Sequence, residues 1–259
     1  MLKATSPCTE NFATEKISLR DELIRFVKQN KRLLPFFLLI RRLSYRTLSF
    51  FNNRRKISNY LKSHQTRKLQ IGSGENVIEG WLNTDRSPTK KIVFLDASKR
   101  FPFNDCTFDY VLSEHLIEHL TYQDGLRLVQ ECYRVLKPGG KIRISTPDLR
   151  FLIELYNENR TELQERYVVW AVKSFLPDIS DNFNIFVINN FFRNFGHKFI
   201  YDYKTLRNLL DYCRFVNMTQ CSVGESNDKN FKAVESHNQY IGNDFNKLES
   251  LILEGTKPL

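Results

Sequence analysis

The sequence predicts an α/β fold built on a mostly parallel sheet. From residue 68 onward, short apolar runs of strand length alternate with segments of helical periodicity, which is typical of strand–helix–strand units. The chain has 259 residues, of which 41% are hydrophobic and 26% are charged. This balance is that of a globular protein, and the chain is long enough to bury a substantial core.

Five short runs are the first predicted strands, and one long helix is predicted between the fourth and the fifth. The strands are expected at residues 68–71, 81–84, 91–95, 108–112 and 141–145. The helix is expected over residues 122–136, where Pro138, Gly139 and Gly140 end it. Residues 75–80 leave room for little more than one helical turn between the first two strands.

A glycine or an acidic side chain stands at the end of each predicted strand: Gly72, Asp85, Asp96, Glu114 and Asp148. In open α/β sheets the ligand lies beyond the carboxyl ends of the strands, so these positions predict a binding site. Gly72 and Gly74 have no Cβ, which permits a sharp turn and a close approach of ligand to backbone. A carboxylate after the second strand can accept both ribose hydroxyl hydrogens, and one after the third can accept from an adenine amino group.

The basic residues are concentrated at the start of the chain. Residues 1–68 hold 16 of the 39 Lys and Arg but only 4 of the 29 Asp and Glu, so they carry +12 while the remainder carries −2. We therefore predict a basic helical extension over residues 1–66 and a catalytic domain over residues 67–259.

The extension contains an apolar stripe at helical spacing, formed by Phe36, Leu39, Ile40, Leu43 and Phe50. A basic amphipathic helix is typical of binding to an anionic membrane surface, although such a helix can also pack on the catalytic body. Nucleic acid is the less favoured partner, because it needs exposed cations more than a continuous apolar stripe. The longest apolar run has eight residues, and no signal peptide is recognised, so we expect a cytoplasmic protein, peripheral at most to the inner membrane face.

The five cysteines, Cys8, Cys106, Cys132, Cys213 and Cys221, are widely spaced. No CxxC pair or Cys/His cluster occurs, so neither a disulfide framework nor a zinc site is predicted.

Several segments together resemble a known family. Residues 69–74 (LQIGSG), 80–85 (GWLNTD), 101–103 (FPF), 108–120 (FDYVLSEHLIEHL) and 134–140 (RVLKPGG) follow the order found in class I S-adenosylmethionine-dependent methyltransferases, and look most like the type 11 branch. A looser likeness runs through residues 196–203 (GHKFIYDY) to a last strand at 248–257, and is similar to small bacterial methyltransferases of surface-glycan gene neighbourhoods. The resemblance implies a Rossmann-like sheet whose last strand is antiparallel.

The resemblance also implies S-adenosyl-L-methionine as cofactor and assigns residues to it. Asp85 would hold the ribose and Asp96 would face the adenine. The methionine part and the transferred methyl would be bordered by Gln70, Gly72, Ser73, Gly74, Ser113 and Glu114. The sequence departs from the family at two points: Gln70 replaces the usual acid, and Asp85 follows Gly72 by only 13 residues.

Methyl transfer to a hydroxyl needs a group that accepts a proton. His197 and His115 are the first candidates for this base, followed by His119 and Glu114. We expect an insertion at about residues 149–200 to cover the substrate, and the acceptor to be a small molecule, sugar or glycolipid that is O-methylated.

Two other functions remain open: a catalytically silent methyltransferase-like scaffold, and a nicotinamide-dependent oxidoreductase. The second is disfavoured because residues 72–77 (GSGENV) lack the third small residue of GxGxxG.

Overall fold

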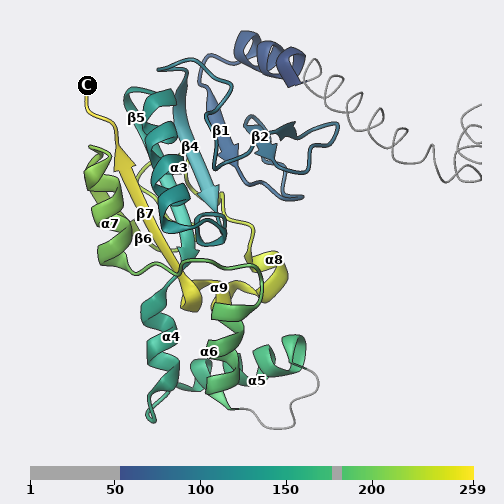
Figure 1. Ribbon diagram of the computed structural model, residues 1–259, viewed down its shortest axis with the longest axis vertical. Helices are drawn as coiled ribbons and strands as arrows, with labels where there is room; N and C mark the ends of the chain where they lie inside the picture. Colours follow the sequence, from purple (N-terminus) through teal and green to yellow (C-terminus); the bar gives the residue numbers. More distant parts are fainter. Residues whose placement is uncertain (1–52, 177–182) are drawn as a thin grey trace, which may run out of the picture. The chain divides into compact units, whose positions relative to one another are not determined.

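A seven-stranded sheet organises the part of the chain that the computed structural model describes, residues 53–176 and 183–259 (Figure 1). The strand order is β3-β2-β1-β4-β5-β7-β6. Strands β1 to β5 run parallel to one another, and β7 runs antiparallel to both β5 and β6. The expected Rossmann-like sheet with an antiparallel last strand is therefore confirmed.

The strands lie close to their predicted positions. They are β1 (Lys68–Ile71), β2 (Leu82–Asp85), β3 (Val93–Phe94), β4 (Phe108–Glu114), β5 (Leu136–Pro147), β6 (Val216–Cys221) and β7 (Ser250–Thr256). Strand β5 begins five residues before its predicted start, because Leu136 already pairs with Phe108 of β4. The register then shifts at the segment with Gly139, whose φ is 76°, and pairing resumes between Lys141 and Tyr110. Between β1 and β2 the chain forms turns in place of a helix, as the short spacing requires.

The helices have recognisable starts. They are α3 (Tyr122–Val135), α4 (Leu149–Tyr156), α5 (Glu162–Phe175), α6 (Asn184–Arg193), α7 (Tyr203–Tyr212), α8 (Asn238–Ile241) and α9 (Asn243–Glu249), with a short 3₁₀ helix η1 (Ile117–His119) after β4. The side chains of Thr121, Asp148, Thr161 and Asp202 accept backbone N–H groups at the first turns of α3, α4, α5 and α7. Such caps satisfy amide groups that a helix leaves without partners at its start.

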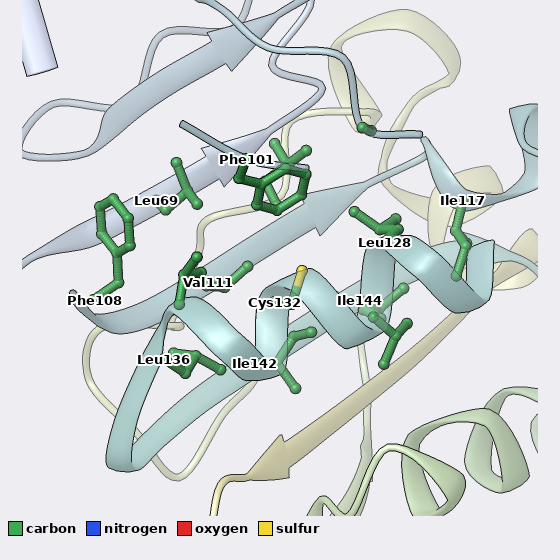
Figure 2. Close-up of a cluster of buried hydrophobic side chains, with 14 of the residues drawn as sticks. Leu69, Phe101, Phe108, Val111, Ile117, Leu128, Cys132, Leu136, Ile142 and Ile144 are labelled. Atoms are coloured by element: carbon green, nitrogen blue, oxygen red, sulfur yellow. The ribbon is translucent and has the colours of Figure 1, made fainter. Parts of the chain in front are cut away.

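The main core lies between α3 and the sheet. Leu128 and Cys132 of α3 face Val111 of β4 and Ile142 of β5, and all four side chains are almost completely buried (Figure 2). Helix α3 is amphipathic, so burying its apolar face fixes it on the sheet. This packing holds the carboxyl end of β4 and the η1 segment in a defined position.

Helices α4, α5 and α6 form a second layer beyond the end of β5 and the start of β7 (Figure 1). They share a separate apolar core that includes Phe151, Tyr167, Val168 and Phe191, against which Phe245 of α9 packs. These helices fall inside the insertion predicted at about residues 149–200.

A compact unit begins at Asn53, upstream of the predicted boundary at residue 67. Residues 53–63 are helical, and Tyr60 is 9% exposed in the main core. The apolar stripe predicted at residues 36–50 lies outside the described residues. No helix of the described part of the chain is long and apolar enough to cross a membrane.

Candidate functional site

The carboxyl edge of the sheet carries the glycine pair that the sequence singled out. Strand β1 lies between β2 and β4, where the strand order changes direction, and ligands bind at such points in α/β sheets. Gly72 and Gly74 follow β1 with φ of 71° and 53°, a left-handed backbone that favours glycine. A Cβ at Gly74 would meet no atom within 4 Å, whereas one at Gly72 would lie 2.9 Å from Leu116. The backbone at Gly74 is thus open, while Gly72 makes room for a neighbouring side chain.

Asp85 and Asp96 stand beside this turn at the ends of β2 and β3. Asp85 Oδ2 accepts the N–H of Gly74 at 3.1 Å, and its Oδ1 accepts the N–H of Ser87 at 2.8 Å. A groove passes over Gly74, Asp85 and Ser87. Burial works against ionisation of Asp96, but the hydroxyl and N–H of Ser98 bind its Oδ1 and hold its pKa below the usual value.

Two buried polar atoms at this edge have no hydrogen-bond partner among the described residues. They are Oε1 of Gln70 on β1 and Oγ of Ser113 on β4, whose side chains are 2% and 1% exposed. Ile71 is the register partner of Ser113, so Gln70 and Ser113 lie on opposite faces of the sheet. Buried polar atoms are rarely left unpaired, so both positions fit contact with a polar ligand.

A cavity of about 320 Å³ lies next to this edge, where the chain leaves β4. Four of the five histidines line one part of it, together with two glutamates: His115, His119, His197, His237, Glu118 and Glu249. Aromatic side chains of α5 and α6 line another part, among them Tyr167, Trp170 and Phe191. The cavity therefore offers an apolar surface and a cluster of groups that can donate or accept protons or bind a metal.

The polar groups form two trios, each of two histidines and one glutamate. Within each trio the candidate ligand atoms lie within 4.8 Å of one another: His115 with His237 and Glu249, and His119 with His197 and Glu118. His115 also connects the trios, because its Nδ1 lies 3.3 Å from Oε1 of Glu118.

Charge differs among the histidines. Burial lowers the pKa of His115, but the hydrogen bond and charge of Glu118 outweigh it, so the pKa of His115 is raised. Burial raises the pKa of Glu118, but the hydrogen bond and charge of His115 outweigh it, so the pKa of Glu118 is lowered. Burial lowers the pKa of His197, which favours the neutral imidazole.

His115, His119 and His197, predicted as candidate bases, lie in this one cavity, and their catalytic role stays a prediction. Glu114, the fourth candidate, is not among the residues that line it. Its carboxylate accepts the N–H and hydroxyl of Ser236 and the N–H of His237, at 2.8, 3.0 and 2.9 Å. This geometry gives Glu114 a structural role in holding the segment before α8.

Sequence reasoning missed His237 and Glu249 and gave Glu118 only a structural role. Both missed residues lie more than 100 positions beyond β4, in segments without a motif. A count of the five histidines alone could have drawn attention to His237.

Part of the chain is similar in sequence to known methyltransferases. Residues 69–144 match the family model described as "Methyltransferase domain". A segment of 47 residues is 45% identical to a Mycolicibacterium smegmatis protein named "Probable S-adenosylmethionine-dependent methyltransferase", and spans 18% of each chain.

Among solved structures, a SAM-dependent methyltransferase from Archaeoglobus fulgidus is 19% identical, with 80% of this chain and 93% of that chain covered and a TM-score of 0.45. Phosphoethanolamine N-methyltransferase 2 of Haemonchus contortus, solved with S-adenosylhomocysteine, is 15% identical. The match covers 75% of this chain and 49% of that chain, with a TM-score of 0.41.

Proposed function

We propose that this chain, whose residues 69–144 match a methyltransferase-domain family model, is a class I S-adenosylmethionine-dependent methyltransferase that methylates a small acceptor held in the histidine cavity. S-adenosylmethionine is the cofactor of this domain. The observation that carries the proposal is the position of the cavity: its lining begins at His115, the residue directly after β4, whose end belongs to the predicted cofactor edge.

The carboxyl edge fits the cofactor. We assign the methionine part to the open backbone at Gly74 and to the unpaired Oγ of Ser113, whereas Gln70 faces the other side of the sheet. We assign the ribose to Asp85 and the adenine to Asp96, because a carboxylate accepts hydroxyl and amino hydrogens. Bound there, the cofactor supplies a methyl group on a sulfonium, and the protein has to hold the acceptor atom in line with it.

The cavity favours a small acceptor with a polar group. Its volume of about 320 Å³ is at the lower end of the range for ligand sites, which suits a single sugar ring or a molecule of similar size. Tyr167, Trp170 and Phe191 offer ring faces to the apolar part of such a molecule. The histidines stand where a hydroxyl would need a proton acceptor, and this supports O-methylation.

Calorimetry with S-adenosylhomocysteine tests the cofactor edge. Asp85→Ala should weaken binding by about 5- to 150-fold, the effect of losing charge-assisted hydrogen bonds of about 1–3 kcal/mol. Asp211→Ala, which removes an exposed carboxylate from α7, is the matched control and should bind as wild type does. Equal affinity of all three proteins would place the cofactor elsewhere.

Transfer of labelled methyl to a panel of sugars, glycolipids and small hydroxyl compounds tests the reaction. Trp170→Ala should lower turnover of the accepted compound while S-adenosylhomocysteine affinity stays unchanged, because Trp170 lines only the cavity. Cofactor binding without transfer to any compound would favour the silent scaffold. Binding of NADH in place of S-adenosylhomocysteine would favour the oxidoreductase.

The basic segment supports one further part of the proposal, a membrane partner. Residues 1–52 hold 10 Lys and Arg against 4 Asp and Glu, and each basic side chain near an anionic bilayer contributes about 1 kcal/mol. We expect the full chain to sediment with anionic vesicles at low salt and to be released at high salt. A lipid-linked acceptor would be reached in this way. Absence of sedimentation at low salt would rule the membrane partner out.

A further inference from the structure

The two histidine–glutamate trios of the cavity differ in how many of their candidate ligand atoms already have polar partners within the protein. In the first trio, His237 Nε2 lies 3.2 Å from Oε1 of Glu249, and Oε2 of Glu249 accepts the hydroxyl of Tyr167. The rings of His115 and His237 are stacked, with centroids 3.9 Å apart and planes at 23°. Nitrogen lone pairs lie in the ring plane, so two nearly parallel rings do not direct them to one point. In this trio, His237 and Glu249 are already bonded to each other, Glu249 is also bonded to Tyr167, and the two rings do not converge.

In the second trio the histidine His197 is oriented as a metal ligand usually is. Its Nδ1 lies 2.8 Å from the carbonyl oxygen of Phe191, which can only accept, so Nδ1 carries the hydrogen. The neutral ring therefore has a free lone pair on Nε2. Metal-bound histidines nearly always donate their other N–H to an oxygen in this manner, which fixes ring and tautomer.

Glu118 brings an incompletely bound carboxylate to the same place. Its side chain is completely buried, and Oε2 accepts the hydroxyl of Thr146 at 3.0 Å. Oε1 is paired with His115 Nδ1 at 3.3 Å and has no other polar partner among the described residues. A buried carboxylate needs a cation beside it, and a metal ion at this oxygen would take over the role that His115 has in its absence.

His119 completes the trio from an exposed side. Its ring centroid lies 4.9 Å from that of His197, and the planes meet at 58°, so both rings can direct a nitrogen to a common point. His119 is only partly buried, which leaves positions on a shared ion open to the cavity.

The backbone holds the three residues together without any ion. Glu118 and His119 are consecutive in η1, and the carbonyl oxygen of Glu118 accepts the N–H groups of Lys198 and Phe199 at 2.7 and 3.2 Å. The segment that carries His197 is thereby tied to η1. Such preorganisation is what a binding site needs from the groups around it.

We propose that Glu118, His119 and His197 bind one divalent transition-metal ion, with two imidazole nitrogens and one carboxylate oxygen as ligands and an open position toward the cavity. Two imidazoles and one carboxylate suit Zn²⁺, Fe²⁺, Co²⁺ and Mn²⁺ better than Mg²⁺ or Ca²⁺, which prefer oxygen. Its role rests on the proposed function: an acceptor hydroxyl bound to the ion would lose its proton to water more readily, because a metal ion stabilises the alkoxide.

Metal titration of the full chain tests the site without cofactor or acceptor. The protein, freed of any affinity tag and treated with a chelator, is titrated with Zn²⁺ by calorimetry and with Co²⁺ by its visible absorption. We expect one ion per chain. His119→Ala, His197→Ala and Glu118→Gln should each abolish saturable binding at micromolar metal, and Thr146→Val should weaken it by about 10- to 100-fold through the supporting hydrogen bond.

Variants of the other trio are the matched controls. His237→Ala and Glu249→Gln should keep the ion, and His115→Gln should keep it or bind it more tightly, because this change removes the group that competes for Glu118. Thermal melting of each variant shows that it is folded.

Three results would overturn the site: no saturable binding of Zn²⁺ or Co²⁺, binding that persists in both His119→Ala and His197→Ala, or equal loss in His237→Ala. The proposed function is tested separately. If the chain binds S-adenosylhomocysteine but binds no metal ion, only the metal site is overturned. If it binds a metal ion but does not bind S-adenosylhomocysteine, only the proposed function is overturned.

Discussion

Arg143 of β5 and Glu235 form an ion pair in which neither side chain is more than 1% exposed. The same guanidinium binds Glu254 of β7 and donates to the carbonyl oxygen of Glu225 at 2.9 Å. Glu235 in turn accepts the N–H of Gly224 at 2.9 Å. Arg143 therefore fastens the segment between β6 and α8 to the sheet, immediately before Ser236 and His237, and so positions one wall of the cavity.

Removing this cation should destabilise the protein strongly. Arg143→Met leaves the buried charge of Glu235 without a cation, and we expect the free energy of unfolding to fall by about 3–5 kcal/mol. Glu235→Gln should cost less, because Gln can still accept from Arg143 and Glu254 still balances its charge. Urea denaturation followed by circular dichroism measures both. Equal losses in the two variants would contradict this account of the ion pair.

Gly125 and Tyr201 offer a test of close packing. A Cβ on Gly125 in α3 would lie 2.5 Å from the hydroxyl of Tyr201, a fully buried group without a hydrogen-bond partner among the described residues. Gly125→Ala should therefore cost about 1–3 kcal/mol through overpacking. Tyr201→Phe should raise stability by about 1 kcal/mol, because it removes an unpaired buried hydroxyl.

The double variant of these positions should reverse the effect of alanine. Without the hydroxyl, the nearest atom to the new Cβ is 3.4 Å away on Ile117, so alanine gains its helix propensity of about 1 kcal/mol over glycine. Thermal unfolding of wild type, the two single variants and the double variant measures the coupling free energy between the two positions. If Gly125→Ala costs the same in both backgrounds, the contact with Tyr201 is not what limits this position.

Asp228 should make stability depend on pH in the acid range. Burial opposes its ionisation, but Lys141 Nζ at 2.8 Å and the N–H of Asn230 at 2.9 Å lower its pKa to about 2. The unfolded value is about 3.9, so this interaction stabilises the fold above about pH 4 and is lost as the pH falls toward 2. Lys141 is 39% exposed, and solvent screening should reduce the contribution to about 1 kcal/mol.

The matched variant is Asp228→Asn. Its unfolding free energy should lie about 1 kcal/mol below that of wild type near neutral pH, and the difference should shrink as the pH falls below 4. A difference that is constant from neutral pH to about pH 3 would assign the loss to packing instead of charge.

Much of the fold followed from the sequence because strand alternation and turn residues are local signals. Residues 68–71 were predicted as observed, and Asp85 was placed at the edge that it occupies. Period-two alternation also separates Ser113 from Glu114, so the two cannot both face one ligand from the same side of β4. The cavity could not be predicted in the same way. Its groups come from η1, His197 and Glu249, which only tertiary packing brings together.

The metal site proposed above has no sequence motif for the same reason. Cysteine and histidine pairs at short spacing belong to sites built on one hairpin or one helix. Glu118 and His119 are adjacent, but His197 is 78 positions away and joins them only through the bonds of Lys198 and Phe199 to η1. Carboxylate–histidine sites assembled in this way leave no local motif.

The last prediction concerns where the extension can be removed. Tyr60 is 9% exposed, its hydroxyl accepts the N–H of Lys68 at 2.8 Å, and it lies 3.0 Å from the carbonyl oxygen of Gly80. Burial raises the pKa of this hydroxyl to about 12, so it stays protonated. Deleting residues 1–66 should therefore destabilise the domain, whereas deleting residues 1–52 should leave its unfolding free energy within about 0.5 kcal/mol of wild type.

Tyr60→Phe should lower the free energy of unfolding by about 1–3 kcal/mol, because the N–H of Lys68 is left without its acceptor. Urea denaturation compares the three, and the shorter deletion is then the proper control for vesicle sedimentation. Equal stability of both deletions would show that residues 53–66 contribute nothing to the domain.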